Sequence, residues 1–154
     1  MINAYLSLGS NLGDRKSNLS SALKELNSGI EIQVKQVSQF YETTAESKLQ
    51  QADYLNCACE IQTILSAEEL LKKTQDIEKQ LGRDSKGNYD PRTIDIDILF
   101  YNETIIATDT LIIPHPSLHE RSFVLTPLNE IAPNLIHPLL DKKIHDLYQE
   151  VVGY

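Results

Sequence analysis

Two aspartates, Asp95 and Asp97, lie inside the segment TIDIDILFY, whose other residues are mostly β-branched or aromatic and typical of a strand. Because side chains alternate along a strand, both carboxylates point to one face, about 7 Å apart along the backbone. Four apolar residues are expected on the opposite face: Ile94, Ile96, Ile98 and Phe100. Two unpaired carboxylates repel each other, and hard oxygen ligands with open positions suit Mg²⁺. The pair is therefore compatible with a magnesium site but is weak evidence by itself, with a solvated face or pairing to arginines as the alternatives.

Basic side chains near this strand could bind phosphate groups beside such a metal. Arg92 stands just upstream of the two aspartates, and Arg83 follows a predicted helix. Downstream, PHPSLHER places His115, His119 and Arg121 within one short segment between or after prolines. The guanidinium fork matches phosphate oxygens in a bidentate geometry. Each histidine taken singly is more often structural or solvated, and the spacing of the three matches no common zinc motif. The basic residues therefore point to a phosphorylated ligand.

A second group of side chains suits a flat heterocyclic ligand. Tyr54 and Asn56 are expected to share one face of a strand over residues 54–63, whose alternate residues face the core. An aromatic ring can stack on a planar ligand, and a carboxamide beside it can recognise one donor and one acceptor on the ligand edge. Phe123 could cover the other side of the ligand. Ordinary packing is the alternative for each of these residues.

The elements that position these groups follow from the hydrophobic periodicity. The segments in chain order are a strand (2–8), a turn (GSNLGD), a helix with an apolar stripe (19–26), a strand (30–34), a polar loop (42–53), a strand (54–63), a helix opened by the capping box SAEE (66–69), a polar loop (83–92) and a strand (94–101). This βαββαβ order predicts an α+β fold with an antiparallel, ferredoxin-like sheet that helices cover on one face. Short helices and turns, punctuated by prolines, are expected after Tyr101.

The second predicted helix carries Gln75 and Glu78 at i and i+3, so they form a polar pair on one side of the helix. An ordinary solvent-facing pair is the simplest explanation of that spacing.

Length and charge limit the class of protein. The 154 residues suffice for one domain, which we expect to span 1–154, and the net charge of −8 argues against binding a nucleic acid over a wide surface. No apolar run approaches the roughly 18 residues of a membrane span. Cys57 and Cys59 lie at i and i+2 on one strand, a poor geometry for a mutual disulfide. We therefore expect a cytoplasmic protein with reduced cysteines and neither membrane nor nucleic-acid partners.

Five segments together resemble the 6-hydroxymethyl-7,8-dihydropterin pyrophosphokinase family of folate biosynthesis. They are SLGSNLGDR, YLNCACEI, LLKKTQDIEKQLGR, DPRTIDIDILFY and PHPSLHERSFVLTPLNEIAP. The resemblance runs from residue 1 to about residue 138. It implies an α/β sandwich around the ferredoxin-like core, and an enzyme that transfers the β,γ-pyrophosphoryl group of ATP to the hydroxymethyl group of the pterin and releases AMP. It also leads us to expect a monomer or a weak dimer.

The same resemblance implies a set of site residues. Asp95 and Asp97 would hold two Mg²⁺, and Arg92 and Arg121 would join them in catalysis. The pterin-binding positions would be Thr43, Tyr54, Asn56, Tyr89 and Phe123. The ATP-binding positions would be Gln75, Glu78, Arg83, Arg92, His115 and Arg121. The chain departs from the family pattern at Tyr89 and Asp90, where the family has tryptophan and glycine, and at Thr44–Glu46, where it commonly has prolines and a small apolar residue.

Two other functions fit parts of these patterns. A ferredoxin-like nucleic-acid or regulatory module would need a basic sheet face with exposed aromatic residues, which the acidic balance and the two aspartates argue against. Another Mg²⁺-dependent nucleotidyl or phosphoryl transferase could use the same pair of aspartates. Formation of AMP rather than ADP from ATP, in the presence of the hydroxymethyl pterin, would distinguish these functions.

Overall fold

The structure is a computed structural model that describes residues 1–43, 53–82 and 93–153. Its elements in chain order are β1 (Ile2–Ser10), α1 (Arg15–Leu26), β2 (Ile32–Val37), β3 (Tyr41–Thr43), β4 (Tyr54–Thr63), α2 (Ala67–Gln80), β5 (Asp95–Tyr101), β6 (Ile106–Ala107), β7 (Ile112–Ile113), the 3₁₀ helix η1 (Leu118–Glu120), α3 (Ser122–Ile131), β8 (Ile136–His137), β9 (Lys142–Lys143) and α4 (Ile144–Val152).

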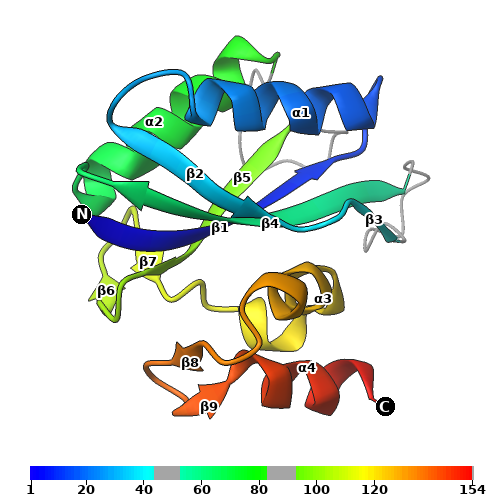
Figure 1. Ribbon diagram of the computed structural model, residues 1–154, viewed down its shortest axis with the longest axis vertical. Coiled ribbons are helices and arrows are strands. Elements are labelled where there is room, and N and C mark those ends of the chain that lie inside the picture. Colours follow the sequence, from blue (N-terminus) through cyan, green and yellow to red (C-terminus); the bar gives the residue numbers. More distant parts are fainter. Residues whose placement is uncertain (44–52, 83–92, 154) are drawn as a thin grey trace.

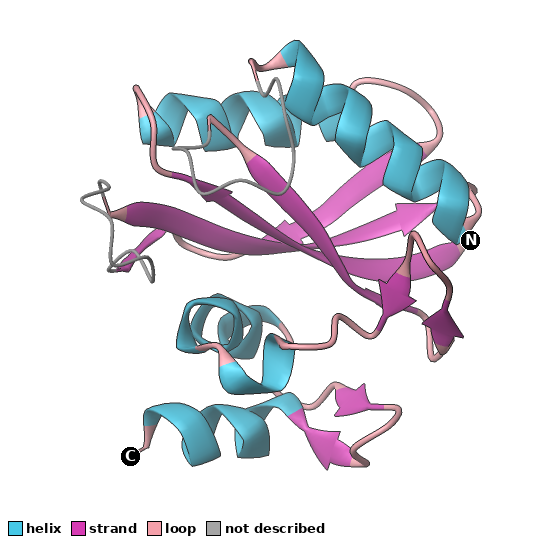
Figure 2. Ribbon diagram, turned by 180° about the vertical axis from the view of Figure 1, so that it is seen from behind, coloured by secondary structure: helices cyan, strands magenta, loops and turns pink. Residues whose placement is uncertain are grey.

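The main sheet lies between two layers of helices. Its strands are all antiparallel, in the order β2-β4-β1-β5, with β3 paired to β4 beyond the end of β2. Helices α1 and α2 cover one face, and α3, η1 and α4 lie on the other, as both views show (Figures 1 and 2). This arrangement confirms the predicted α+β fold, and places β5 at an edge of the sheet.

Local sequence signals define where the first two helices begin. The Asp14 carboxylate accepts a hydrogen bond from the Ser17 amide at the start of α1. At the start of α2, Ser66 and Glu69 form the predicted capping box, in which each side chain bonds to the backbone amide of the other residue.

Two apolar cores lie on the two faces of the sheet. The core beneath α1 and α2 contains alternate strand residues, among them Leu6, Leu8, Cys57 and Ile96. The core beneath α3 and α4 contains Ala58, Leu99, Phe100, Val124 and Leu128, with others. Both cysteines are free and buried, and burial raises the pKa of the Cys57 thiol to about 12.

Phe100 does not share a face with Ile94, Ile96 and Ile98, so that part of the prediction is wrong. Tyr5 is paired with Phe100 and Leu6 with Ile98, which leaves Leu99 as an extra residue in β5. This bulge reverses the alternation: Phe100 packs in the core beneath α3, whereas the isoleucines stay in the core beneath α2. Strict alternation holds only where both strands advance one residue at a time.

Other boundaries differ from the prediction in smaller ways. Ile30 is 92% exposed, and β2 begins at Ile32. Glu42 and Thr43, predicted to lie in a loop, pair with β4 as part of β3. Gly9 and Ser10, predicted to lie in a turn, belong to β1. Residues 44–52 and 83–92 of the predicted polar loops lie outside the described residues. Among the residues that the structure describes, no helix is long and apolar enough to cross a membrane.

Candidate functional site

Asp95 and Asp97 face a cleft of about 570 Å³ at the β5 edge of the sheet. Other walls come from α2, from the hairpin of β6 and β7, and from the segment after His115. The structure thereby brings together five predicted site residues from separate parts of the chain: Glu78, Asp95, Asp97, His115 and Arg121. The volume falls in the range of sites for small molecules and cofactors.

The β5 bulge helps to position His115 beside Asp97. The carbonyl of Leu99, the bulged residue, accepts a hydrogen bond from the His115 amide at 3.1 Å. The ring Nδ1 atom of His115 accepts a 3.3 Å hydrogen bond from the Ser117 amide, and its Nε2 atom lies 4.0 Å from Asp97 Oδ2. Because Nδ1 is the acceptor, the neutral ring carries its proton on Nε2, which faces the carboxylate.

The charges around His115 act on its pKa in opposite directions. Burial lowers the pKa most, the Asp97 carboxylate raises it, and the Arg121 guanidinium lowers it again. The net effect is a pKa below the usual value, which favours a neutral ring that can donate one hydrogen bond into the cleft.

Glu78 is a buried residue and does not form a solvent-facing pair with Gln75. Its side chain is part of the cleft wall, and Oε2 accepts a hydrogen bond of 2.8 Å from the amide of Ile96, the residue between the two aspartates. The residue itself is only 2% exposed. Glu78 therefore ties α2 to the edge strand where the aspartates lie. Gln75, one turn earlier, is half-buried and does not line the cleft.

Thr43, Tyr54 and Asn56 lie together where β3 pairs with β4. Thr43 is opposite Tyr54 in the pairing, and the buried Asn56 donates from Nδ2 to Thr43 Oγ1 at 2.7 Å. This hydrogen bond fixes the carboxamide orientation. Phe123 is on α3, the helix that packs against β4, and the Arg121 guanidinium lies 5.4 Å from the centroid of its ring.

Gly9 joins these two groups, and the sequence reasoning missed it. In the sheet, Gly9 of β1 is paired with Asn56 on one side and with Asp95 on the other. A Cβ atom at this position would lie 2.7 Å from Asn56 Oδ1 and 3.4 Å from Tyr54 Cδ1. A glycine inside a strand often marks such a close approach, so the signal was present in SLGSN.

Arg15 is a second residue that the sequence reasoning did not single out. Its Nη1 atom donates to the carbonyl of Asp53 at 2.8 Å, and its Nη2 atom contacts the Glu42 carboxylate. Glu42 directly precedes Thr43, and Asp53 directly precedes Tyr54. One side chain of α1 therefore holds the two strand ends that carry Thr43 and Tyr54.

The remaining predicted residues fall into two groups. Arg83, Tyr89 and Arg92 lie outside the described residues, as does Asp90. His119 contacts Glu120 at 3.5 Å and does not line the cleft.

Within residues 1–43, 53–82 and 93–153, no group of three or more histidine, cysteine or acidic side chains could hold a metal ion. Two carboxylates side by side suit Mg²⁺, which takes few protein ligands and completes its shell with water and phosphate oxygens.

Comparisons with known proteins show which family this chain belongs to. The family model described as 7,8-dihydro-6-hydroxymethylpterin-pyrophosphokinase matches residues 5–133. The chain is 48% identical over 129 residues to the 2-amino-4-hydroxy-6-hydroxymethyldihydropteridine pyrophosphokinase of Bacillus subtilis, covering 84% of this chain and 77% of that protein. It is 41% identical over 150 residues to the Aquifex aeolicus protein of the same name, covering 97% and 92%.

Some relatives are much longer. The "Folic acid synthesis protein FOL1" of Dictyostelium discoideum is 46% identical over 136 residues, which are 88% of this chain and 20% of that protein. The chain thus spans about a fifth of that relative. Among solved structures, Plasmodium falciparum HPPK-DHPS with pteroate superposes with a TM-score of 0.78 at 18% identity, covering 97% of this chain and 42% of that one. At this identity the likeness shows the fold alone.

Proposed function

Because this chain belongs to the 7,8-dihydro-6-hydroxymethylpterin-pyrophosphokinase family, we propose that it transfers the β,γ-pyrophosphoryl group of ATP to 6-hydroxymethyl-7,8-dihydropterin in folate biosynthesis. The hydroxymethyl oxygen attacks the β-phosphorus, and the bond from that phosphorus to the oxygen that bridges it to the α-phosphorus breaks. AMP leaves with the electron pair of that bond, and the hydroxyl proton passes to water. The products are the pterin diphosphate and AMP.

The observation that carries this proposal is the row formed by Asn56, Gly9 and Asp95 across three neighbouring strands. Adjacent strands are about 4.8 Å apart, so the backbones at Asn56 and Asp95 are separated by about 10 Å. A pterin whose edge is bound by Asn56 could therefore extend its hydroxymethyl group toward the two aspartates. The glycine between them adds no side chain of its own to that path.

The pterin would be held by stacking on its two faces and by hydrogen bonds to its ring edge. Tyr54 and Phe123 would contact its two faces, and Asn56, oriented by Thr43, would bond to its ring edge. Transfer of a phosphoryl-type group gains mostly from positioning of the reactants, which such a rigid platform supplies.

The chemistry of the donor set fits magnesium: two carboxylates on one strand face, in a cleft that also holds an arginine and a histidine. Asp95 and Asp97 would hold two Mg²⁺, which would neutralise phosphate charge and lower the pKa of the attacking hydroxyl. Glu78 would keep the aspartates in place through the Ile96 amide.

The nucleotide phosphates would be bound by the cationic and donor groups of the cleft. Arg121 would bind phosphate oxygens next to Phe123, at the junction of the two substrates, and His115 would donate from Nε2. From the family resemblance we also propose Arg83 and Arg92 as phosphate ligands, Gln75 as a nucleotide contact, and Tyr89 beside the pterin. No general base is required if the hydroxyl proton passes to water.

The direct test is to identify the nucleotide product. Purified protein incubated with ATP, Mg²⁺ and 6-hydroxymethyl-7,8-dihydropterin is expected to form AMP and the pterin diphosphate in equal amounts, with no ADP. Omission of the pterin is expected to stop AMP formation. Production of ADP would favour a different phosphoryl transferase, and absence of any AMP at saturating Mg²⁺ would refute the proposal.

A further inference from the structure

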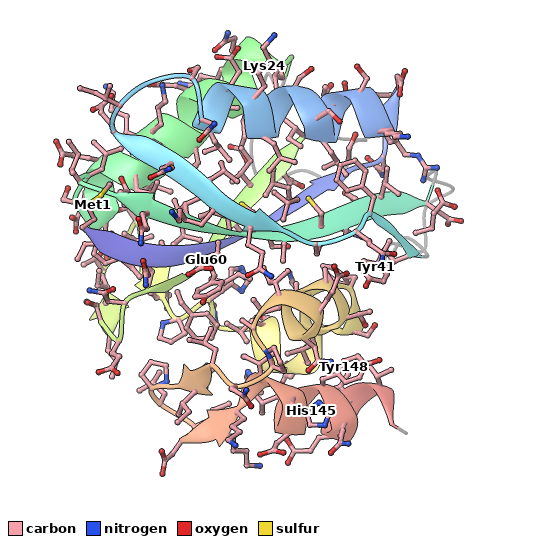
Figure 3. The ribbon with its side chains drawn as sticks, viewed as in Figure 1. Met1, Lys24, Tyr41, Glu60, His145 and Tyr148 are labelled. Atoms are coloured by element: carbon pink, nitrogen blue, oxygen red, sulfur yellow. The ribbon has the colours of Figure 1, made fainter. Side chains whose placement is uncertain are left out.

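Glu130, near the end of α3, is bonded to the segment that leads into β3. Its Oε1 and Oε2 atoms accept the Gln39 amide at 3.1 and 3.2 Å, and Oε1 also accepts the Tyr41 hydroxyl at 2.5 Å. The carboxylate thus holds one backbone group and one side chain of the same short segment. Figure 3 shows Tyr41 near one end of the sheet, on the side where the C-terminal helices lie.

The two elements that Glu130 joins carry opposite sides of the proposed pterin site. Helix α3 begins at Ser122 and presents Phe123, whereas β3 begins at Tyr41 and ends at Thr43. Tyr41 is also paired with Asn56 in the sheet. The position of α3 relative to β3 and β4 therefore sets the separation between Phe123 and the Thr43–Tyr54–Asn56 group.

We propose that Glu130 is a positioning residue that fixes the separation between Phe123 and the Thr43–Tyr54–Asn56 group, and so determines how well the site accepts a flat bicyclic pterin. The inference rests on the proposed function, because the ligand is the pterin named there. Glu130 itself is exposed and lies outside the cleft residues, so it acts through the elements that it joins.

The chemistry of the Glu130 contact suits a residue that holds α3 and β3 at a constant separation. Hydrogen bonds to an ionised carboxylate are shorter and stronger than bonds between neutral groups. The hydrogen bond to Glu130 is the main cause that raises the pKa of Tyr41 to about 12, with burial second, so the hydroxyl stays a donor at neutral pH. Two donors on one carboxylate also restrict the relative rotation of the two elements more than a single bond would.

The test compares pterin and nucleotide binding in three variants with a matched control. Glu130→Ala removes all of these bonds, Glu130→Gln keeps the side-chain length and one oxygen acceptor, and Tyr41→Phe removes only the hydroxyl bond. Glu150→Ala is the control, since Glu150 is an exposed acid in the same layer whose partner is Lys142, outside β3. Dissociation constants are measured for 6-hydroxymethyl-7,8-dihydropterin, with a saturating unreactive ATP analogue and Mg²⁺, and for that analogue alone.

We expect Glu130→Ala to weaken pterin binding about tenfold, which is the change that one or two lost hydrogen bonds produce. Glu130→Gln and Tyr41→Phe should each weaken it by a smaller factor. Affinity for the ATP analogue should stay within about twofold in all variants, and Glu150→Ala should leave both constants unchanged. In the free protein, hydrogen exchange at the Gln39 amide should be faster in Glu130→Ala, a readout that needs no pterin.

Three outcomes would overturn the inference. One is an unchanged pterin affinity in both Glu130→Gln and Tyr41→Phe. These two variants also test the proposal if Glu130→Ala fails to fold. Another is an equal loss of pterin and nucleotide affinity, which indicates general loosening of the fold. The third is unchanged Gln39 exchange in Glu130→Ala. If the unaltered protein does not bind the pterin, the proposed function fails instead, and the exchange result still reports on the contact.

Discussion

Gly9 lies so close to Asn56 that a Cβ atom at position 9 would be 2.7 Å from the Asn56 Oδ1 atom. The two residues are directly paired between β1 and β4. The Asn56 side-chain nitrogen already donates a hydrogen bond of 2.7 Å to Thr43 Oγ1. A side chain at position 9 would therefore displace the carboxamide that we propose binds the pterin edge. The smallest residue of the strand thus maintains the geometry of its neighbour.

Gly9→Ala should accordingly weaken pterin binding about tenfold, because the Asn56 side chain must move and lose its bond to Thr43. Crowding of a buried site should also lower the free energy of unfolding by about 1–3 kcal/mol. Isothermal titration and denaturant unfolding measure the two effects. Gly29→Ala is the matched control, since a Cβ there would meet nothing within 4 Å. Similar behaviour of the two variants would show that Gly9 has no such role.

Asp97→Ala should lower kcat at least about 100-fold, because loss of metal-based charge stabilisation costs several kcal/mol in the transition state. The Asp97 side chain is 51% exposed, so its removal should change the free energy of unfolding by less than about 1 kcal/mol. Steady-state kinetics over a range of Mg²⁺ concentrations, with thermal unfolding beside them, give both quantities. The exposed Glu103→Gln serves as control, and retention of activity in Asp97→Ala would exclude the metal role.

Tyr54→Ala should raise the pterin Kd about 5- to 150-fold, the equivalent of about 1–3 kcal/mol for a lost stacking platform. Tyr54→Phe keeps the ring and should bind the pterin within a few-fold of the unaltered protein. Fluorescence titration of the pterin measures both constants. An unchanged Kd in the alanine variant would contradict stacking on Tyr54.

Arg15→Ala should raise the KM for the pterin several-fold, about the effect of one lost charged hydrogen bond, with little change in the KM for ATP. The physical reason is that Arg15 bonds to Glu42 and to the Asp53 carbonyl, the residues next to Thr43 and Tyr54. The exposed neighbour Lys16→Ala provides the control in initial-rate kinetics. Equal changes in both KM values would argue against a local effect on the pterin side.

His137 should make the fold less stable at mildly acidic pH. Burial, and then the nearby His119, lower its pKa, and its Nδ1 atom accepts the amides of Leu139 and Leu140, each at 3.2 Å. The unfolded chain therefore takes up a proton at the usual histidine pKa of about 6.5, while the folded protein resists it. Stability is fully present above that pH and falls as the pH drops below it.

Urea unfolding between pH 7.5 and 5 tests this expectation. His137→Asn keeps a side-chain acceptor but does not titrate, so its stability should depend less on pH than that of the unaltered protein. Some dependence should remain, because burial lowers the pKa of His115 as well. His145→Asn, on the exposed side of α4, is the control (Figure 3). An identical pH dependence in His137→Asn and the unaltered protein would contradict the role of His137.

Local signals predicted much of the fold. The apolar stripe over 19–26 and the Ser66–Glu69 capping box each depend on residues within one or two turns of each other. The order of strands and helices followed from the same short-range patterns. The predictions were wrong where a single extra residue changed the alternation, as at Leu99, or where apolar character was not buried, as at Ile30.

The sequence by itself determined the α+β element order, the family, and the pair of aspartates on one strand face, because each of these is encoded in residues close together in the chain or in motifs kept in order. Only the tertiary structure decided that Gly9 separates Asn56 from Asp95, that the Leu99 carbonyl holds His115, and that Glu130 joins α3 to β3. These relationships join residues that are far apart in the chain. Strand pairing and helix packing bring them together, and no short-range pattern encodes those distances.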